Sequence, residues 1–285
     1  MTSAYRIGDS IAPVMTMPHV ILTDHRSSAA PVDLVALTMH VPTADAGAAL
    51  GVLPATVVLP AYNEEIGLAA LLPSLVELSR DRFEVVVVDD GSTDGTANLA
   101  ESFGCRVVRH AANAGKGVAV RTGLSAARGD KVIIMDADDT YPVDAVVELI
   151  NRLDECEMVV GVRTLGRTNI PPLNRFGNTV LTTAIRIASG SPWTDPLTGF
   201  YGMRRTVLEK MDLQSNGFSL EAEIAMKSVR LGLRVMDHPI VYRARAGVSK
   251  LHPVRDGIRI AGTIVSLGMR RLARGCVQTV APYFP

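Results

Sequence analysis

Two aspartates separated by one residue, Asp136 and Asp138, directly follow an apolar run and are the side chains best suited to chemistry. Residues two positions apart on an extended chain point to the same side, so both carboxylates can approach one cation. Mg²⁺ and Mn²⁺ prefer such oxygen ligands and often share them with phosphates. The pair therefore predicts a divalent-metal site, although a turn or capping role explains it equally well. Asp139 or Thr140, followed by Tyr141-Pro142, is typical of a helix start. Asp139 is therefore expected to be structural or to support the metal ligands without contacting the metal.

A second group of acids, Asp89 and Asp90, ends another apolar run and opens the turn DDGSTDGT. Glycines that make the turn and a cap by Ser92 or Asp94 account for its later residues. They do not account for two adjacent carboxylates at the end of a strand. We expect this pair to accept hydrogen bonds from a base or a ribose.

Lys116 lies in Asn113-Ala-Gly-Lys-Gly117, just before a predicted helix. A lysine at a helix N-terminus opposes the helix dipole unless an anion is near. Together with exposed backbone N–H groups it suits a phosphate, although the segment alone is more typical of a surface loop. No Ser-His-Asp or Cys-His arrangement can be recognised from the spacing, and His110, His238 and His252 are expected to be structural.

These residues stand at the ends of predicted strands. Continuous apolar runs at 56–59, 84–88 and 131–135 suit strands that are buried on both faces of a parallel sheet, and Pro60 is expected to stop the first. Helical patterns lie between and after them, at residues 65–78, 96–103, 118–127 and 143–153. Pro73 predicts a kink or a late start in the first helix. The alternation predicts a doubly wound α/β fold, in which ligands bind beyond the carboxyl ends of the strands.

The second half of the chain is less regular. Its patterns predict helices at 174–189, 220–231 and 256–274, strands at 198–203 and 235–242, and a basic loop at 243–250. The last helix carries several arginines, namely Arg255, Arg259, Arg270, Arg271 and Arg274.

Composition narrows the function classes. The 285 residues are 47% hydrophobic and carry 29 basic and 29 acidic side chains. Zero net charge argues against a broad nucleic-acid-binding surface. No apolar run reaches about 18 residues, the N-terminus lacks the layout of a secretory signal, and three scattered cysteines indicate a reducing compartment. We expect a cytoplasmic enzyme.

Together, the segments VVLPAYNEE, VVVVDDGSTDGT, NAGKGVAVRTGLSAARGD and VIIMDADDTYP resemble inverting glycosyltransferases of family 2, which have the GT-A fold. The resemblance extends from about Leu53 to Lys250 and is strongest to the polyprenyl-phosphate (dolichol-phosphate) mannosyl- and glucosyltransferases. Residues 1–52 show no sustained period and are expected to form a partly ordered extension or to be disordered. The resemblance implies a nucleotide-sugar domain at 53–250, and a helical tail is expected at 251–285.

The resemblance also implies roles for individual residues. A nucleoside diphosphate-sugar would contact Pro60, Ala61, Tyr62, Glu64, Lys116, Asp136, Ala137 and Asp138, with Asp89 or Asp90 on the base. Asp136 and Asp138 would hold Mg²⁺ or Mn²⁺ with the diphosphate. Catalytic roles fall to Asp138, Arg163, Glu221, Arg245 and Lys250.

Further matches and one departure complete the resemblance. The family's Gly-x-Arg, expected after the next strand, corresponds to Gly161-Val-Arg163, and Arg175 is a second acceptor-side candidate. The segment Asp195–Phe200 would wall the sugar pocket, and the basic loop at 245–250 would close over the ligand. Thr140 replaces a glutamine common in the family, which removes one implied metal ligand.

The implied activity is transfer of the sugar, with a GDP-sugar favoured, to polyprenyl phosphate or to a soluble acceptor. A hydroxyl acceptor would need a base, for which Glu221 or Glu223 is the candidate. Two alternatives stay open: a nucleotide-sugar mutase that needs no acceptor, and a non-catalytic binding protein. Peripheral membrane contact through the arginine-rich helix and self-association are further expectations.

Overall fold

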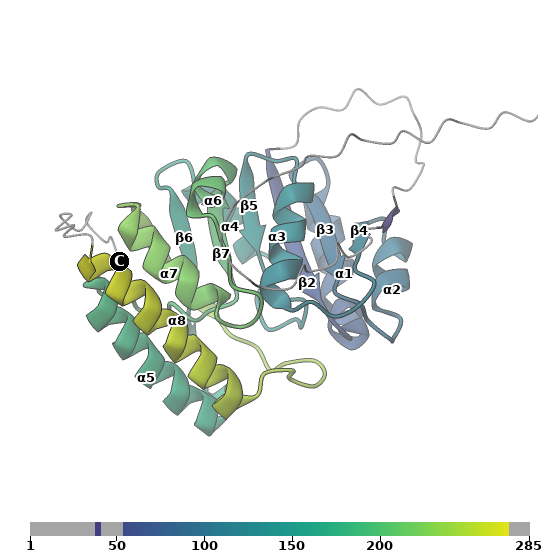
Figure 1. Cartoon of the computed structure of the whole chain (residues 1–285). Helices are drawn as coiled ribbons and strands as arrows, with labels where there is room; N and C mark the ends of the chain where they lie inside the picture. The colour runs from purple at the N-terminus through teal and green to yellow at the C-terminus, as the bar shows by residue number, and fades with distance from the viewer. Residues whose placement is uncertain (1–37, 41–53, 274–285) are drawn as a thin grey trace, which may run out of the picture. The chain divides into compact units, whose positions relative to one another are not determined.

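The computed structural model describes residues 38–40 and 54–273, in which eight strands form one sheet flanked by helices (Figure 1). The strands are β1 Thr38–His40, β2 Ala55–Ala61, β3 Glu84–Asp89, β4 Arg106–Arg109, β5 Lys131–Ile134, β6 Met158–Leu165, β7 Tyr201–Arg204 and β8 Val235–Val241. The helices are α1 Glu65–Ser79, α2 Thr96–Ser102, α3 Lys116–Ala126, α4 Ala145–Arg152, the 3₁₀ turn Arg167–Asn169, α5 Pro172–Ser189, α6 Arg205–Met211, α7 Leu220–Arg230 and α8 Pro253–Ala273.

The strand order is β1-β4-β3-β2-β5-β7-β6-β8. Strands β4, β3, β2 and β5 are parallel, β7 runs antiparallel between β5 and β6, and β8 is parallel to β6. The prediction of a mostly parallel α/β sheet is thus confirmed. Because parallel strands end at the same edge, the residues that follow β2, β3 and β5 come together there.

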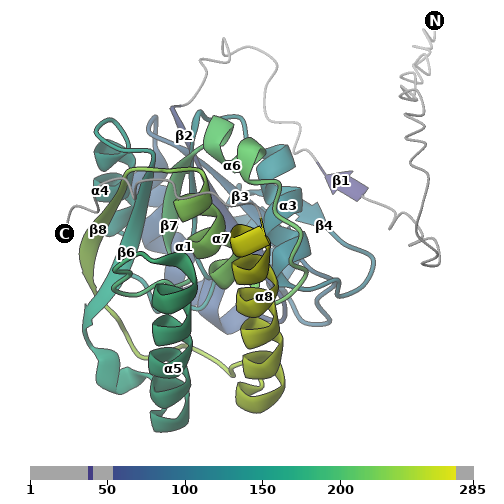
Figure 2. The ribbon, with the colours of Figure 1, turned by 60° about the vertical axis from the view of Figure 1, so that its left-hand side comes forward.

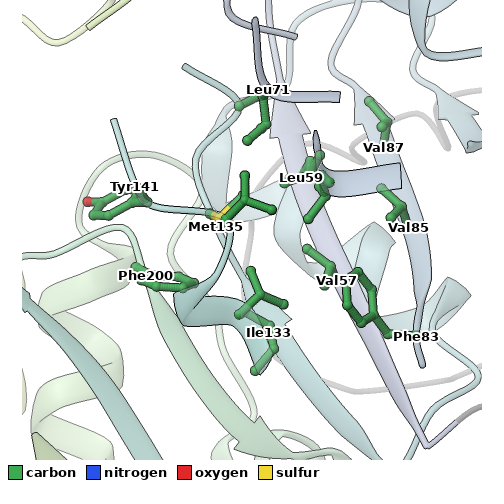
Figure 3. Close-up of a cluster of buried hydrophobic side chains, with 14 of the residues drawn as sticks. Val57, Leu59, Leu71, Phe83, Val85, Val87, Ile133, Met135, Tyr141 and Phe200 are labelled. Atoms are coloured by element: carbon green, nitrogen blue, oxygen red, sulfur yellow. The ribbon is translucent and has the colours of Figure 1, made fainter. Parts of the chain in front are cut away.

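The apolar runs of the central strands supply both faces of the sheet. Val57 and Leu59 pack on one side with Leu68 and Leu72 of α1, and Figure 3 shows part of this cluster around Ile133. The alternate residues, such as Val58, belong to a second cluster that includes parts of α3, α7 and α8. Continuous valine runs therefore fit these strands because every side chain in them meets a buried layer.

Several sequence expectations need correction. Pro60 does not stop β2, which continues to Ala61. The Val58 carbonyl accepts the Met135 N–H on the β5 side, and pairing with β5 ends at Val58. Pro60 lies two residues after Val58, so its backbone nitrogen is directed to the same side. Because β2 and β5 are no longer paired there, proline, which has no N–H, costs the sheet no hydrogen bond.

The helix starts also differ from expectation. Helix α1 begins at Glu65 and runs through Pro73, so a late start is wrong. Helix α4 begins only at Ala145, so neither Asp139 nor Thr140 starts it. Asp139 instead adopts a left-handed conformation with φ 58°, and the Thr140 hydroxyl donates to Asp138 at 2.6 Å.

Other elements match or extend the expectations. The helices predicted near α2, α3, α5, α7 and α8 are confirmed within three residues at each end. The sequence interpretation missed β1, β4 and α6, and it placed the Gly161–Arg163 segment after a strand, whereas this segment lies inside β6.

The predicted extension at 1–52 lies outside the described residues except for β1, which pairs with β4. Residues 274–285 of the predicted tail also lie outside them. Within the described part, no helix combines the length and the apolar character needed to cross a membrane.

Helices α5 and α8 lie side by side and extend past the sheet (Figure 2). They run in the same direction, because a Cβ added at Gly268 near the end of α8 would lie 3.4 Å from Ala188 near the end of α5. Their inner faces bury Ile185, Ile260 and Ile264 against the second cluster.

Helix α7 fixes the loop before it through an acidic side chain. Glu223 accepts the backbone N–H of Ser215 at 2.7 Å and of Gln214 at 2.9 Å, and pairs with Lys227 at 2.7 Å. The loop in turn contacts α3, where a Cβ at Gly117 would lie 1.8 Å from the Ser215 carbonyl oxygen. Burial opposes ionisation of Glu223, but Lys227 and the two N–H donors lower the pKa of its carboxyl below the ordinary value.

We expect Glu223→Gln to lower the free energy of unfolding by about 2 kcal/mol at pH 7, because hydrogen bonds to a charged group are lost. A lowered folded-state pKa adds stability above the ordinary glutamate pKa, near 4.5, and this stability is lost as pH falls. The difference from the parent should therefore shrink in acid. Urea unfolding from pH 7 downward measures it, with exposed Glu77→Gln as control. A difference that is constant with pH would contradict the ionic role.

Candidate active site

A cavity of about 1540 Å³ opens at the edge where β2, β3 and β5 end, and it continues between α5 and α8. It exceeds the roughly 300–1000 Å³ of ordinary small-molecule pockets. Its lining includes most of the sequence-predicted site residues: Pro60, Ala61, Tyr62, Glu64, Asp90, Lys116, Asp136, Ala137, Asp138, Arg163, Glu221, Arg245 and Lys250. The strand order thus brings together side chains that are up to almost two hundred residues apart in the sequence.

Asp136 lies at the centre of the first charge cluster. Lys116 Nζ lies 2.6 Å from Asp136 Oδ1 and 2.6 Å from Glu221 Oε1. Burial opposes its charge, but the two carboxylates raise the pKa of Lys116 far above its ordinary value. A lysine at a helix N-terminus is unfavourable unless a negative charge is near, and here two carboxylates supply that charge. Burial raises the pKa of Glu221, against the pull of Lys116.

Asp138 belongs to a neighbouring cluster that the basic loop supplies with cations. Arg245 Nη1 donates to Asp138 Oδ2 at 2.5 Å, and its other terminal nitrogen pairs with Glu64. Lys250 Nζ donates to the Asn63 carbonyl oxygen at 2.6 Å and to Glu64 Oε1 at 3.1 Å. Burial raises the pKa of both Asp138 and Glu64, and Arg245 opposes this in each case.

Backbone bonds hold the basic loop in place as well. The Arg243 N–H donates to the Thr140 carbonyl at 2.9 Å, and the Ala246 N–H donates to the Asp138 carbonyl at 3.2 Å. The loop therefore runs beside the segment that carries both aspartates. Gly247, with φ 89°, provides the left-handed turn that brings Lys250 back toward the sheet edge.

The Asp89-Asp90 pair divides into two different environments. Asp89 accepts the Ser92 N–H at 3.0 Å, as in a turn, and does not line the cavity. Asp90 lines it, and its carboxylate accepts the Gly115 N–H at 2.7 Å and contacts His110 Nδ1 at 2.6 Å. His110 thus has the structural partner expected for it, and Asp90 is the member of the pair that can meet a ligand.

Arg163 is buried and held by protein groups. Its guanidinium makes a two-pronged contact with Asp195, at 2.7 and 2.6 Å, and donates to the Leu197 carbonyl at 3.0 Å. It also lies 5.5 Å from the centre of the Tyr242 ring. Arg163 therefore positions the Asp195–Phe200 segment at one wall of the cavity. The other acceptor-side candidate, Arg175, is exposed on α5 and does not line the cavity.

Tight packing limits the space around Asp136. A Cβ added at Gly199 would lie 2.1 Å from Asp136 Oδ2, so a larger residue would force this carboxylate out of its present position. The Gly199 N–H donates to the buried Tyr141 hydroxyl at 2.6 Å. Tyr141 packs against Tyr242 and Phe200, with ring centres 5.5 and 5.2 Å apart. Sequence reasoning missed Tyr141 and Tyr242 as cavity residues, since no spacing distinguishes them from ordinary core aromatics.

The carboxylates fit a hard divalent cation that shares its ligands with a substrate. Within the described ranges, no group of three or more His, Cys, Asp or Glu side chains is arranged to hold a metal ion. Asp136 and Asp138 would then be its protein ligands, and phosphate or water oxygens would complete the shell, as is usual for Mg²⁺. Glu64 Oε2 is buried and has no hydrogen-bond partner among the described residues, which leaves acceptor capacity beside them.

Comparisons with known proteins identify the family of this chain. The family model for Glycosyl transferase family 2 matches residues 56–212. The dolichyl-phosphate hexose transferase of Haloferax volcanii is 34% identical over 222 residues, which cover 76% of this chain and 95% of that protein. The polyprenol monophosphomannose synthase of Mycolicibacterium smegmatis is 30% identical, and the match covers 68% of this chain and 80% of the relative.

A solved structure has the same fold. The glucosyl-3-phosphoglycerate synthase of Mycobacterium tuberculosis, in complex with Mn²⁺, UDP-glucose and phosphoglyceric acid, superposes with a TM-score of 0.62 at 26% identity. The match covers 78% of this chain and 80% of that chain. With the GT-A fold, the family match and these relatives in agreement, the chain belongs to glycosyltransferase family 2 and is a glycosyltransferase.

Proposed function

We propose that the protein transfers a sugar from a nucleoside diphosphate-sugar to the phosphate of a polyprenyl phosphate, with Mg²⁺ or Mn²⁺ held by Asp136 and Asp138. The observation that carries this proposal is the pairing of buried and partly buried carboxylates with Lys116, Arg245 and Lys250 in one cavity. When a diphosphate and its metal ion bind, the diphosphate can pair with the basic side chains and the metal ion with the carboxylates, so no charge is left unpaired. The relatives named for transfer to dolichyl phosphate or for polyprenol monophosphomannose synthesis support the acceptor.

The state of the candidate bases favours a phosphate acceptor over a hydroxyl. Glu221 is engaged by Lys116, and Glu223 by Lys227 and two backbone N–H groups. Neither is free to remove a proton from an alcohol. A phosphate acceptor is already ionised, so it needs no general base.

In the proposed reaction, an acceptor phosphate oxygen forms a bond to the anomeric carbon. The bond from that carbon to the diphosphate oxygen breaks, and its electron pair stays on the nucleoside diphosphate. Lys116, Arg245 and Lys250 then stabilise the new negative charge, because their positions are fixed before the bond breaks. The bound metal would add Lewis-acid stabilisation of the same leaving group.

The base and the sugar follow from different arguments. We assign Asp90, which lines the cavity, as the acceptor of a hydrogen bond from the base. GDP is favoured by the resemblance to the mannosyltransferases, whereas the solved neighbour binds UDP-glucose. The direct test is to incubate GDP- and UDP-sugars with Mn²⁺ and a short-chain isoprenyl phosphate. Formation of the isoprenyl phosphosugar supports the proposal, whereas a new nucleotide sugar of unchanged mass without acceptor would indicate a mutase instead.

The metal assignment predicts a clear difference between neighbouring aspartates. We expect Asp136→Asn with Asp138→Asn to weaken Mn²⁺-dependent nucleotide binding by at least about tenfold, because carboxylate ligands are lost. Asp139→Asn is the matched control, since Asp139 does not line the cavity and asparagine tolerates its left-handed backbone. Calorimetry with and without Mn²⁺ measures both. Equal affinity in the double variant and the parent would refute the site.

The basic loop predicts a separation of turnover from affinity. We expect Arg245→Ala to lower kcat by about 100-fold while nucleotide affinity changes by less than about threefold, because its charge acts mainly as the diphosphate leaves. Arg243→Ala is the control, because its side chain is half exposed and lies 3.6 Å from Asp139 instead. Kinetics and separate binding measurements test this. An unchanged kcat in Arg245→Ala would exclude the role.

A further inference from the structure

Helix α5 carries a second apolar stripe on the side that faces away from the sheet. Leu173, Phe176, Val180 and Ile187 are all more than half exposed, and Ile187 is 80% exposed. Their spacing of three, four and seven residues places them along one side of a helix. The opposite side buries Ile185, so both sides of α5 are apolar.

Helix α8 repeats this arrangement beside it. Val254, Ile258, Val265 and Met269 are also more than half exposed and follow one helical side at intervals of four, seven and four. The opposite side buries Asp256, Ile260 and Ile264. The two helices are parallel neighbours (Figure 2). Because each exposed stripe lies opposite the buried side of its own helix, both stripes face away from the body of the protein. We call these eight side chains the outer face of α5 and α8.

Among the described side chains of these two helices, the exposed charged ones are all arginines. Helix α5 contains no acidic residue, and the one acidic residue of α8, Asp256, is 4% exposed. Arg175 on α5 and Arg255 and Arg259 on α8 are exposed. The two arginines of α8 lie between the apolar stripe and the cavity, which they also line, and are 3.5 and 3.7 Å from Asp256. A protein with zero net charge thus has a locally cationic apolar surface. Contiguous exposed apolar groups of this kind mark an interaction site rather than ordinary solvent surface.

The combination distinguishes between two kinds of partner. A second copy of the chain in two-fold contact would bring its own arginines against these, which repel one another. An anionic lipid surface offers both an apolar layer and negative headgroups, which suits an apolar stripe flanked by arginines.

We propose that the outer face of α5 and α8 docks on an anionic phospholipid surface. This inference rests on the proposed function, because a polyprenyl phosphate is held in a membrane by its chain. The inner sides of the same two helices line the cavity through residues such as Asn178 and Thr263. Docking therefore sets the cavity beside the lipid headgroups, where the acceptor phosphate lies.

The test is flotation of the full chain with lipid vesicles. The parent should float with vesicles of phosphatidylcholine and phosphatidylglycerol, and less with phosphatidylcholine alone or at high salt. Phe176→Ser with Ile258→Ser should lower binding on the order of tenfold, since two large apolar side chains are lost. Ile66→Ser is the matched control, because Ile66 on α1 is 67% exposed and Ile258 is 69% exposed. Absence of parent binding, or equal binding by the double variant, overturns the proposal.

Two further measurements separate this proposal from the others. Transfer to a water-soluble short-chain isoprenyl phosphate should be unchanged in the double variant, whereas transfer to vesicle-embedded polyprenyl phosphate should fall with vesicle binding. A parent that floats but transfers no sugar to either acceptor would refute the proposed function and leave the docking surface standing. A parent that is dimeric in solution and becomes monomeric in the double variant, with no vesicle binding, assigns the face to a second copy instead.

Discussion

Four carboxylates collected at one sheet edge need cations, because charge removed from water is costly unless it is paired. Glu64, Asp136, Asp138 and Glu221 receive theirs from Lys116, at the start of α3, and from Arg245 and Lys250, in the loop after β8. The three cations come from segments well over a hundred residues apart in the chain. The requirement for charge pairing therefore ties the loop after the last strand to the first strands of the sheet.

This pairing also explains why the site is suited to a charged substrate. Each cation that now neutralises a carboxylate is a group that can neutralise a diphosphate, and each carboxylate released in the exchange can hold a divalent cation. The surrounding packing keeps these groups from rearranging freely. Gly199 leaves just enough room for Asp136, and the two-pronged contact between Arg163 and Asp195 holds the facing wall. The chemistry is thus prepared by fixed side chains before any ligand arrives.

Helices α5 and α8 extend the same cavity beyond the sheet. Their inner sides combine core residues with polar groups such as Asn174 and Ser266, which line the cavity. Their outer sides are apolar and flanked by arginine. A helix that is apolar on two sides satisfies the core with one and leaves the other for a partner.

The amino-acid sequence by itself determined the central strands β2, β3 and β5, most helices and the strand-end motifs. Continuous valine runs, the Asp136-Ala-Asp138 spacing and the lysine at a helix start have local causes, so they can be recognised without tertiary structure. Only the tertiary structure decided which partners these groups have. The sequence could not show that Asp89 serves a turn while Asp90 faces the cavity, that Arg163 is occupied by Asp195, or that Arg175 points away. It also predicted a helix start at Asp139 or Thr140, whereas α4 begins at Ala145 and Asp139 has a left-handed backbone with φ 58°. These outcomes depend on pairing and burial between distant segments, which no local pattern encodes.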